Sequence, residues 1–378
     1  MTIEEAVELA RSREISHQVG AATTMRDMAA RHSSQVLEAG GVQALPHLLA
    51  TSHWKQVHHA AATALASLAA ASRGVRDTVI QAGGCATLVR LLSDREPRTQ
   101  EAAAAAMWSL SVGGRAALCA LAAAGAAQPL VKLMRSNVAA RLAAASALYN
   151  LAYEPAAAAA IAAAGPIPVL IHQLTVKGTN LKGGQQKEEL RQVQAAAAGT
   201  LWCLADGQPE SRAAIGAGGG VQALVNLLTR TLDSGNDSGA SFQVAGCLCC
   251  LAQDSSLRDA LRIAGCAEPL VRLLRSGSDG GREQAAGALW RLARGNEAGA
   301  AAVADAGAIL PLVLALGSTS QAVQHQAAGC LRSLCSAAAG AGEAEARRVA
   351  VKAAGARSAL QRLAVACVLP PSFTLLDV

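Results

Sequence analysis

Aromatic residues are scarce in this chain of 378 residues, making up only 2% of it. Charged residues are also few, at 16%, whereas apolar residues reach 52%. This balance excludes an intrinsically disordered chain, because such chains carry much charge and too few apolar residues to form a core. With so few rings available, the core must consist of Leu, Val, Ile and small residues, which let helices approach closely. The composition therefore favours helices packed on helices.

Long runs of like charge are missing as well. The net charge of +6 comes from 33 basic and 27 acidic residues, and no five consecutive residues carry the same charge. Nucleic-acid-binding proteins concentrate their basic residues in a stripe, often with aromatic platforms. The sequence therefore argues against nucleic acid as the partner and for a protein.

The chain also lacks the features of a secreted or membrane-anchored protein. Its start, MTIEEAVELARS, has no apolar signal segment, and residue 2 is Thr rather than the Gly that N-myristoylation requires. Ten cysteines in such a chain predict free thiols in a reducing, intracellular compartment: the cytoplasm, the nucleus or both. Residues 155–171 are uncharged over nearly a membrane span, but Gly165 and Pro166 interrupt them, so we expect two buried helix pieces. The sequence predicts no membrane span and no lipid anchor.

A ten-residue pattern with Leu at its sixth position occurs eight times. GGVQALPHLL and GGCATLVRLL are two examples, and the pattern begins at Gly40, Gly83, Gly125, Gly165, Gly219, Gly265, Gly307 and Gly355. A second marker, Leu or Met followed three residues later by another, keeps the same spacing at Met25/Met28, Leu65/Leu68, Met107/Leu110, Leu148/Leu151, Leu201/Leu204, Leu248/Leu251, Leu289/Leu292 and Leu331/Leu334. Two markers that share a period of about 40 to 47 residues indicate helical repeats.

Each unit has apolar residues at helical spacing and a Gly where one helix must end. A short helix, a bend at Gly, a second helix and a longer third helix with an AAxALxxLA-like run together resemble the armadillo repeat. The resemblance covers residues 17–364 and implies an all-α fold, a right-handed α-solenoid of three-helix repeats. We expect an N-terminal cap and partial repeat in 1–39, a C-terminal cap in 355–369 and a non-helical tail in 370–378. Between them, residues 40–354 would form seven repeats, starting near residues 40, 83, 125, 165, 219, 265 and 307.

Two stretches lengthen the regular spacing between the markers. The extra residues fall at 175–188 and 230–239, in both cases between a second and a third helix. We expect two polar loops on the same edge of the solenoid. They are either tolerated surface insertions or sites for docking or modification.

The armadillo resemblance also indicates where a partner would bind. In armadillo proteins the third helices line a concave groove, and an Asn just before the second Leu of the marker often holds the backbone of an extended peptide. At this groove position the chain has Ser67, Ser109, Asn150 and Arg291 among others, and only Asn150 matches the family. Import adaptors of the family carry Trp four residues earlier, where this chain has Thr63, Ala105, Ser146, Gly199, Gly246 and Gly287.

Aromatic residues recur instead at the residue before the groove position, which we call the aromatic position. They are Trp108, Tyr149, Trp202 and Trp290. One interpretation is a strip beside the groove that binds partner side chains, and the other is packing between neighbouring repeats. Towards the C-terminal end, Arg291 and Arg294 lie one helical turn apart and Arg332 follows in the next unit. These three form either a basic patch for acidic peptides or a solvated face.

Catalytic, metal and cofactor sites find no support in the sequence. Cys247, Cys249 and Cys250 lack the ligand spacing and second ligand pair of a zinc site, and other repeats have Ala or Ser there, so we expect small buried residues. His53, His58 and His59 also lack partners at metal spacing. The sequence contains no phosphate-binding loop, dinucleotide fingerprint, nucleophile elbow or zinc-protease helix. We therefore predict no catalytic, cofactor-binding or metal-binding residues, no cofactor and no enzyme activity.

The sequence thus predicts a non-enzymatic scaffold or adaptor that binds an extended segment of a protein partner in the groove. A nuclear-import-type adaptor with an altered groove is one alternative, although the missing Trp and Asn arrays disfavour it. Another is a non-catalytic substrate-recognition subunit of a ubiquitin ligase, which would need its catalytic module from a partner chain. The identity of the partner and the oligomeric state are not specified by any residue.

Overall fold

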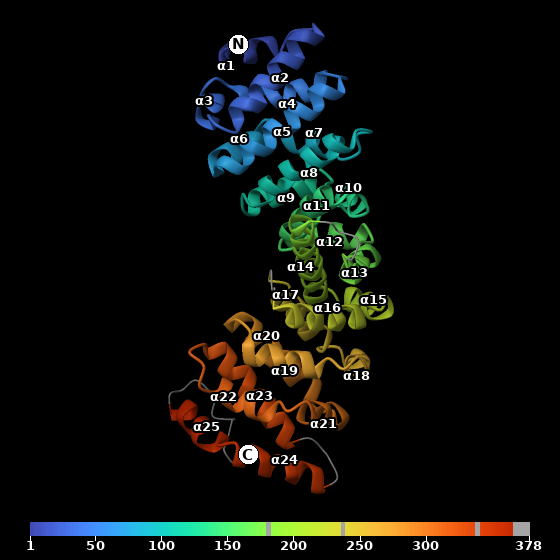
Figure 1. Cartoon of the computed structure of the whole chain (residues 1–378), viewed down its shortest axis with the longest axis vertical. Helices are drawn as coiled ribbons and strands as arrows, with labels where there is room; N and C mark the ends of the chain where they lie inside the picture. The colour runs from blue at the N-terminus through green and yellow to red at the C-terminus, as the bar shows by residue number, and fades with distance from the viewer. Residues whose placement is uncertain (179–182, 236–238, 337–340, 366–378) are drawn as a thin grey trace. The chain divides into compact units, whose positions relative to one another are not determined.

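The computed structural model describes residues 1–178, 183–235, 239–336 and 341–365. Within these residues all regular structure is helical, with 25 helices and no strand. After the N-terminal helix α1 (Ile3–Leu9), helices of three kinds follow one another in a fixed order (Figure 1). Each repeat contributes a first, a second and a third helix, as the sequence predicts.

The helices have the following bounds. The first helices are α3 (Ser33–Glu38), α6 (Arg73–Gln81), α9 (Arg115–Ala123), α12 (Pro155–Ala163), α15 (Pro209–Ala217), α18 (Ser255–Ile263), α21 (Glu297–Asp305) and α24 (Ala341–Ala353). The second helices are α4 (Gly41–Thr51), α7 (Gly84–Leu91), α10 (Ala127–Leu133), α13 (Ile167–Thr175), α16 (Gly220–Ser234), α19 (Ala267–Ser276), α22 (Ile309–Ala315) and α25 (Ala356–Val365). The third helices are α2 (Ile15–Ala29), α5 (Lys55–Ala71), α8 (Pro97–Ser111), α11 (Val138–Leu151), α14 (Gly184–Gly207), α17 (Ala240–Leu251), α20 (Asp279–Ala293) and α23 (Gln321–Ser336).

The chain divides into two compact units. The N-terminal unit comprises residues 1–170 and 178–200, and the C-terminal unit comprises residues 171–177 and 201–378. In the N-terminal unit the third helices α2, α5, α8 and α11 pack one against the next. In the C-terminal unit α17, α20 and α23 pack in the same way. Successive repeats of each unit are therefore held together mainly through their third helices.

The bend before each second helix depends on a glycine in the left-handed region. All eight glycines of the recurring pattern have positive φ, for example 77° at Gly83 and 76° at Gly219. A residue with a Cβ adopts this conformation only with strain. The next residue is constrained too, since a Cβ on Gly84 would lie 2.7 Å from Cγ1 of Val79 in the first helix. The repeated Gly therefore marks the bend between the first and second helices.

The core is formed by the residues of the two sequence markers. The sixth-position leucines are all buried, as are both members of the Leu/Met pairs from Leu65/Leu68 onward. In the first pair Met25 is buried and Met28 is only half-buried. Burying each such side chain contributes roughly 1.5 to 3 kcal/mol. Buried small residues, mostly Ala, lie along the third helices, which explains how each unit forms a core with so few rings.

Arginine side chains satisfy the carbonyl groups at the ends of the helices. Arg76 donates to the carbonyl of Ala69 at 2.8 Å, and Arg212 donates to that of Ala205 at 2.7 Å. In both cases an arginine of a first helix reaches the last turn of the third helix before it. The last carbonyls of a helix have no partner within the helix, and a cation there also complements the helix dipole.

The two predicted polar loops are shorter than expected. The first prediction was wrong for residues 184–188, which belong to helix α14, and the second was wrong for residues 230–234, which extend helix α16. Neither stretch contains Pro, so the helices continue; α16 then ends at Gly235, whose φ is 62°. Residues 179–182 and 236–238 of these two segments lie outside the described residues. The predicted tail at 370–378 and the last residues of the C-terminal cap lie outside them as well.

The uncharged stretch 155–171 forms two helices, α12 and α13, that meet at 86°. This confirms the break predicted at Gly165 and Pro166. Among the described residues no single helix combines the length and the apolar character that crossing a membrane requires. Three bent helix pairs, of which α12 with α13 is one, reach that length and composition only when taken together.

Candidate functional site: the third-helix face

Helices α5, α8 and α11 of the N-terminal unit each leave one stripe of side chains accessible to solvent. On α8 this stripe contains Arg98, Glu101, Ala105, Trp108 and Ser109, at helical spacing, and apart from Pro97 and Gln100 in the first turn the other residues of the helix are buried. Because the three helices pack side by side, their stripes form one surface, which we call the third-helix face. It is the surface where the armadillo resemblance places the groove.

Large apolar and aromatic side chains are exposed on this face. Trp108 is 38% exposed and Val112, just past the end of α8, is 62% exposed. On the neighbouring helix Tyr149 is half-buried, and Tyr153 beyond its end is 59% exposed. The two tyrosine rings are in edge-to-face contact, with centroids 5.1 Å apart. Sequence reasoning missed Val112 and Tyr153, although their place one turn after Trp108 and Tyr149 was a usable signal.

Asn150, the one residue that matches the family at the groove position, is already hydrogen-bonded within the protein. Its amide nitrogen donates to Oγ of Ser111 at 2.8 Å, and that hydroxyl donates to the carbonyl of Trp108 at 2.6 Å. Asn150 therefore joins α11 to α8. Ser67 and Ser109, at the same position in the two preceding repeats, are half-buried on the face.

The aromatic residues of the C-terminal unit pack between repeats instead. The ring of Trp202 lies in edge-to-face contact with Phe242 on α17, at a centroid distance of 5.1 Å. It also covers Gly246, where an added Cβ would lie 2.6 Å from Cδ2 and Cε2 of the indole. Trp290 repeats this arrangement one third helix later, against His325 and over Gly329. At these two places the aromatic ring packs between neighbouring repeats. In each case it lies over the Gly four residues before the groove position, Gly246 or Gly329.

An open cavity of about 490 Å³ lies between α5 and α8 on the third-helix face. Its lining contains His59, Thr63 and Ala66 from α5, together with residues of α8, namely Arg98, Glu101, Ala102 and Ala105. Ala66 stands at the aromatic position of its repeat. Sequence reasoning did not single out Ala66. The signal that could have found it is the presence of Ala at a position where four other repeats have Trp or Tyr.

The three arginines proposed as a basic patch lie in different surroundings. The guanidinium of Arg291 donates to Sγ of Cys249 at 2.6 Å and to the carbonyl of Gly287 at 3.3 Å. Arg294 is exposed just beyond the end of α20. Arg332 is half-buried at the aromatic position of α23. Arg291 therefore bonds within the protein, in contact with the preceding third helix.

Cys247, Cys249 and Cys250 are buried on α17. Burial raises the pKa of Cys249 to about 11 and that of Cys250 to about 12, with the nearby carboxylate of Asp206 adding to the rise at Cys250. The described residues include no group of three or more His, Cys, Asp or Glu arranged to hold a metal ion. These thiols pack in the core as small, unreactive side chains, as their alignment with Ala and Ser predicts.

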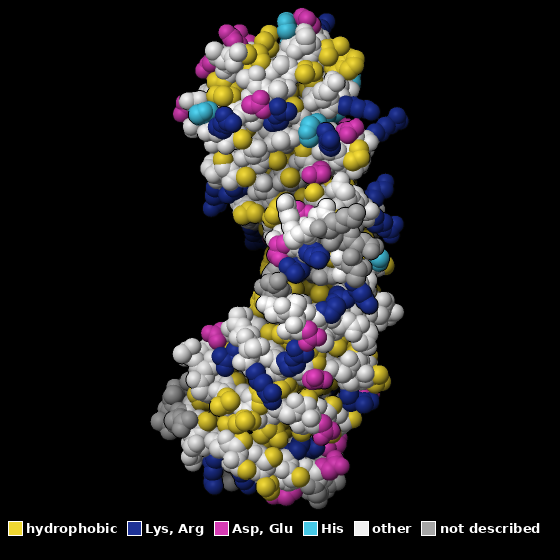
Figure 2. All heavy atoms as spheres, in the orientation of Figure 1, with side chains coloured by type: hydrophobic (Ala, Val, Ile, Leu, Met, Phe, Trp, Pro, Cys, Tyr) yellow, Lys and Arg dark blue, Asp and Glu magenta, His cyan; other side chains and the backbone are white. Residues whose placement is uncertain are grey.

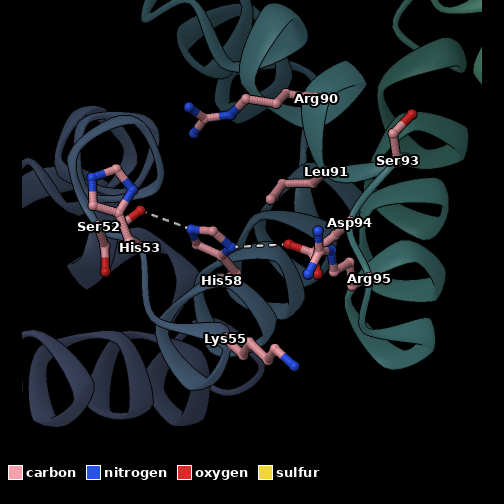
Figure 3. Close-up of a pocket in the computed structure, with 9 residues that line it drawn as sticks. All are labelled: Ser52, His53, Lys55, His58, Arg90, Leu91, Ser93, Asp94 and Arg95. Atoms are coloured by element: carbon pink, nitrogen blue, oxygen red, sulfur yellow. Dashed lines mark hydrogen bonds and ion pairs between the residues drawn. The ribbon is translucent and has the colours of Figure 1, made fainter.

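A second cavity, of about 370 Å³, lies at the edge where second helices connect to third helices (Figure 3). His58 is at its centre, with Nε2 at 2.8 Å from the carbonyl of Ser52 and Nδ1 at 3.1 Å from Oδ2 of Asp94. Burial favours the neutral form of Asp94, but hydrogen bonds from the backbone N–H of Glu96 and from the His58 ring outweigh it and lower the pKa of this carboxyl. Sequence reasoning missed this contact, because the two residues belong to different repeats.

Basic side chains surround that cavity and the next one along the edge. Lys55, Arg90 and Arg95 line the first, and Lys132 and Arg135 line another of about 300 Å³ one repeat later. Figure 2 shows Lys and Arg side chains projecting at the right-hand side of its upper part, where α7 and α10 end. This edge of the N-terminal unit is therefore positively charged.

Comparisons with known proteins agree with this architecture. The armadillo/beta-catenin-like repeat profile matches residues 72–112, 254–294 and 296–336. No curated protein sequence gives a significant match to the chain. A crystal structure of an engineered protein is 29% identical, with a TM-score of 0.78, over 100% of this chain and 97% of the other. A second engineered protein is 32% identical, with a TM-score of 0.56, over 66% of this chain and 97% of the other.

Two further structures share the fold. A designed armadillo repeat protein is 23% identical, with a TM-score of 0.55, over 66% of this chain and all of the other. A structure concerned with a phosphorylation switch in the interaction between cadherin and beta-catenin is 19% identical, with a TM-score of 0.77, over 96% of this chain and 65% of the other. Such repeats form extended surfaces suited to binding other proteins rather than enclosed catalytic pockets. From the repeated three-helix unit, the eight bend glycines and these matches, we conclude that the chain belongs to the armadillo repeat family.

Proposed function

We propose that the protein is a non-enzymatic scaffold and that the third-helix face of its N-terminal unit binds an extended segment of a partner protein. The observation that carries this proposal is the exposure of Trp108, Val112 and Tyr153 on the adjoining helices α8 and α11. Clustered exposed apolar side chains mark interaction sites, and Trp and Tyr supply a large share of the binding energy at such sites.

The spacing of the helices supports an extended segment as the partner. Packed helices lie about 8 to 10 Å apart, and an extended strand rises about 3.3 Å per residue. About every third residue of such a segment would therefore reach a new third helix. Half-buried Ser67, Ser109 and Ser146 supply hydroxyl groups between the aromatic side chains, able to bond to its backbone.

The C-terminal unit offers less free surface at equivalent positions. Trp202 and Trp290 there already cover the next third helix, and Cys249 and Cys250 are buried. A ring at Gly246, where import adaptors carry Trp, would have no room beneath Trp202. The import-adaptor alternative therefore gains no support from this unit. Free thiols such as those of Cys85, Cys119 and Cys247 support a reducing, intracellular setting.

The proposal can be tested by selecting a random peptide library displayed on phage against the immobilised, full-length chain. We expect enriched peptides that bind the wild type and lose at least about tenfold in affinity for the double variant Trp108→Ala, Tyr153→Ala, because anchor residues of this kind contribute about 2 kcal/mol or more. A matched control, Trp54→Ala, removes an exposed Trp at the other, connecting edge. Circular dichroism must show that both variants are folded. Selected peptides that bind the double variant as well as the wild type would refute the proposal.

A further inference from the structure

We infer that the cavity between α5 and α8 is a specificity pocket that takes an aromatic side chain, with Trp the best fit, from the bound partner segment. The inference rests on the proposed function, since it concerns what the third-helix face recognises. It follows from a comparison of the repeats with one another.

Wherever the C-terminal unit has Trp at the aromatic position, the ring fills one defined space. The ring of Trp202 meets two residues of the next third helix, Gly246 and Phe242. They lie four and eight residues before the groove position of that helix. Trp290 lies against the corresponding pair, Gly329 and His325. The same space therefore holds an indole in two separate repeats.

In the repeat that contains α5, no side chain of the protein fills this space. Ala66 stands at the aromatic position, and the two corresponding residues of the next third helix are Ala105 and Glu101, both of which line the cavity. Ala66 places a methyl group where Trp202 and Trp290 place an indole, so the space beside it stays open. Because Ala105 has a Cβ where Gly246 and Gly329 have none, a ring that enters this space must lie further from the backbone of α8 than those indoles lie from α17 and α23. The volume of about 490 Å³ accommodates such a side chain.

The polar groups of the cavity suit an aromatic side chain that carries an N–H. Among the described residues, neither the guanidinium of Arg98 nor the carboxylate of Glu101 has a hydrogen-bond or ion-pair partner. The carboxylate of Glu101 can accept a hydrogen bond from an indole N–H, and the guanidinium of Arg98 can stack on the ring face. An aliphatic side chain would use neither group. Trp108 on the same helix then contacts the adjoining part of the segment.

The ligand-observed experiment uses N-acetyltryptophanamide as the probe, with N-acetylleucinamide as the control, and saturation-transfer NMR on the full-length protein. We expect transfer to the indole protons in the wild type and in Trp54→Ala, which removes an exposed Trp that does not line the cavity. In Ala66→Trp the large new side chain starts from a residue that lines the cavity and obstructs it, so the signal should fall at least about tenfold. Ala66→Leu fills the space partly and serves as a second variant should Ala66→Trp fail to fold, which circular dichroism would show.

The outcomes separate this inference from the proposed function. Equal transfer to the leucine and tryptophan probes, or an unchanged signal in folded Ala66→Trp or Ala66→Leu, would overturn the pocket. The peptides selected on phage give a second readout: we expect an aromatic residue at one fixed position and loss of binding to Ala66→Trp. Peptides that depend on Trp108 but contain no aromatic residue would leave the proposed function standing and overturn the pocket. Peptides that bind the Trp108 variant and Ala66→Trp as tightly as the wild type would overturn the proposed function.

Discussion

Replacing Gly246 by Ala should destabilise the protein, although Ala is the better helix former. Gly246 lies inside α17 beneath the indole of Trp202, and an ideal Cβ there would lie 2.6 to 2.7 Å from three ring atoms. Ordinary contacts begin near 3.4 Å, so the ring must move by nearly 1 Å. Its edge-to-face contact with Phe242 opposes that movement.

The size of the effect follows from two opposing contributions. Overpacking of this kind costs about 1 to 3 kcal/mol, whereas Gly→Ala inside a helix gains about 1 kcal/mol. Because the ring is held by Phe242, we expect a net loss of about 1 to 2 kcal/mol in the free energy of unfolding. The matched control is Gly74→Ala, in an exposed part of α6 with no atom within 4 Å of the added Cβ, which should gain about 0.5 to 1 kcal/mol.

Urea unfolding followed by far-UV circular dichroism gives the free energies, provided that the slope of the transition stays unchanged between variants. In the background Trp202→Leu the penalty of Gly246→Ala should vanish, because the two substitutions act on one contact. If Gly246→Ala stabilises the protein as much as Gly74→Ala does, the Trp-on-Gly packing described above is wrong. A penalty that persists without the indole would lead to the same conclusion.

Three further outcomes are expected. Arg347→Met should lower the free energy of unfolding in urea by about 1 to 3 kcal/mol, because the buried guanidinium donates to Glu297 at 2.8 Å and to the Leu334 carbonyl, and the substitution leaves the half-buried carboxylate unpaired. An unchanged free energy of unfolding would contradict this pairing. The pKa of the Asp94 carboxyl is lowered in the folded state, so this group stabilises the fold above its unfolded pKa of about 3.9, and the stabilisation should disappear as pH falls through the lower folded pKa. Thermal melts of Asp94→Asn should lack this contribution. If the melting temperature of Asp94→Asn depends on acidic pH just as that of the wild type does, this prediction is wrong. Iodoacetamide at mildly alkaline pH should modify exposed Cys119 at least about a hundredfold faster than Cys249, because burial raises the pKa of Cys249 to about 11. Peptide mapping by mass spectrometry measures the two rates, and equal labelling of both cysteines would contradict the prediction.

The repeat register was predictable because it rests on local chemistry. A chain bends sharply with positive φ where Gly stands, and Leu at a fixed distance from that bend must turn towards the core. Those two constraints place the sixth-position leucines and the eight glycines without any knowledge of distant contacts. The polar loops were predicted less well, since residues 184–188 and 230–234 contain nothing that prevents a helix from continuing.

The location of the candidate site stays a prediction, and only the exposure of its residues is observed. The armadillo resemblance placed it on the third helices, and Trp108 is indeed exposed there. A residue at the aromatic position is exposed in one repeat and packed against the next repeat in another. Which of the two occurs depends on the residue that faces it from the next third helix. Trp202 meets Gly246 and lies flat over it, whereas the corresponding residue opposite Trp108 is Ser146.

By itself, then, the sequence determined the fold class, the repeat boundaries at glycine and the side of each helix that is buried, since all of these depend on residues close together in the chain. Only the tertiary structure decided which polar groups are already used and which spaces are open. Asn150 bonds to Ser111, His58 to Asp94 and Arg291 to Cys249, each across some 40 residues. The cavity beside Ala66 is likewise the product of two helices, and its shape exists only when their side chains face one another.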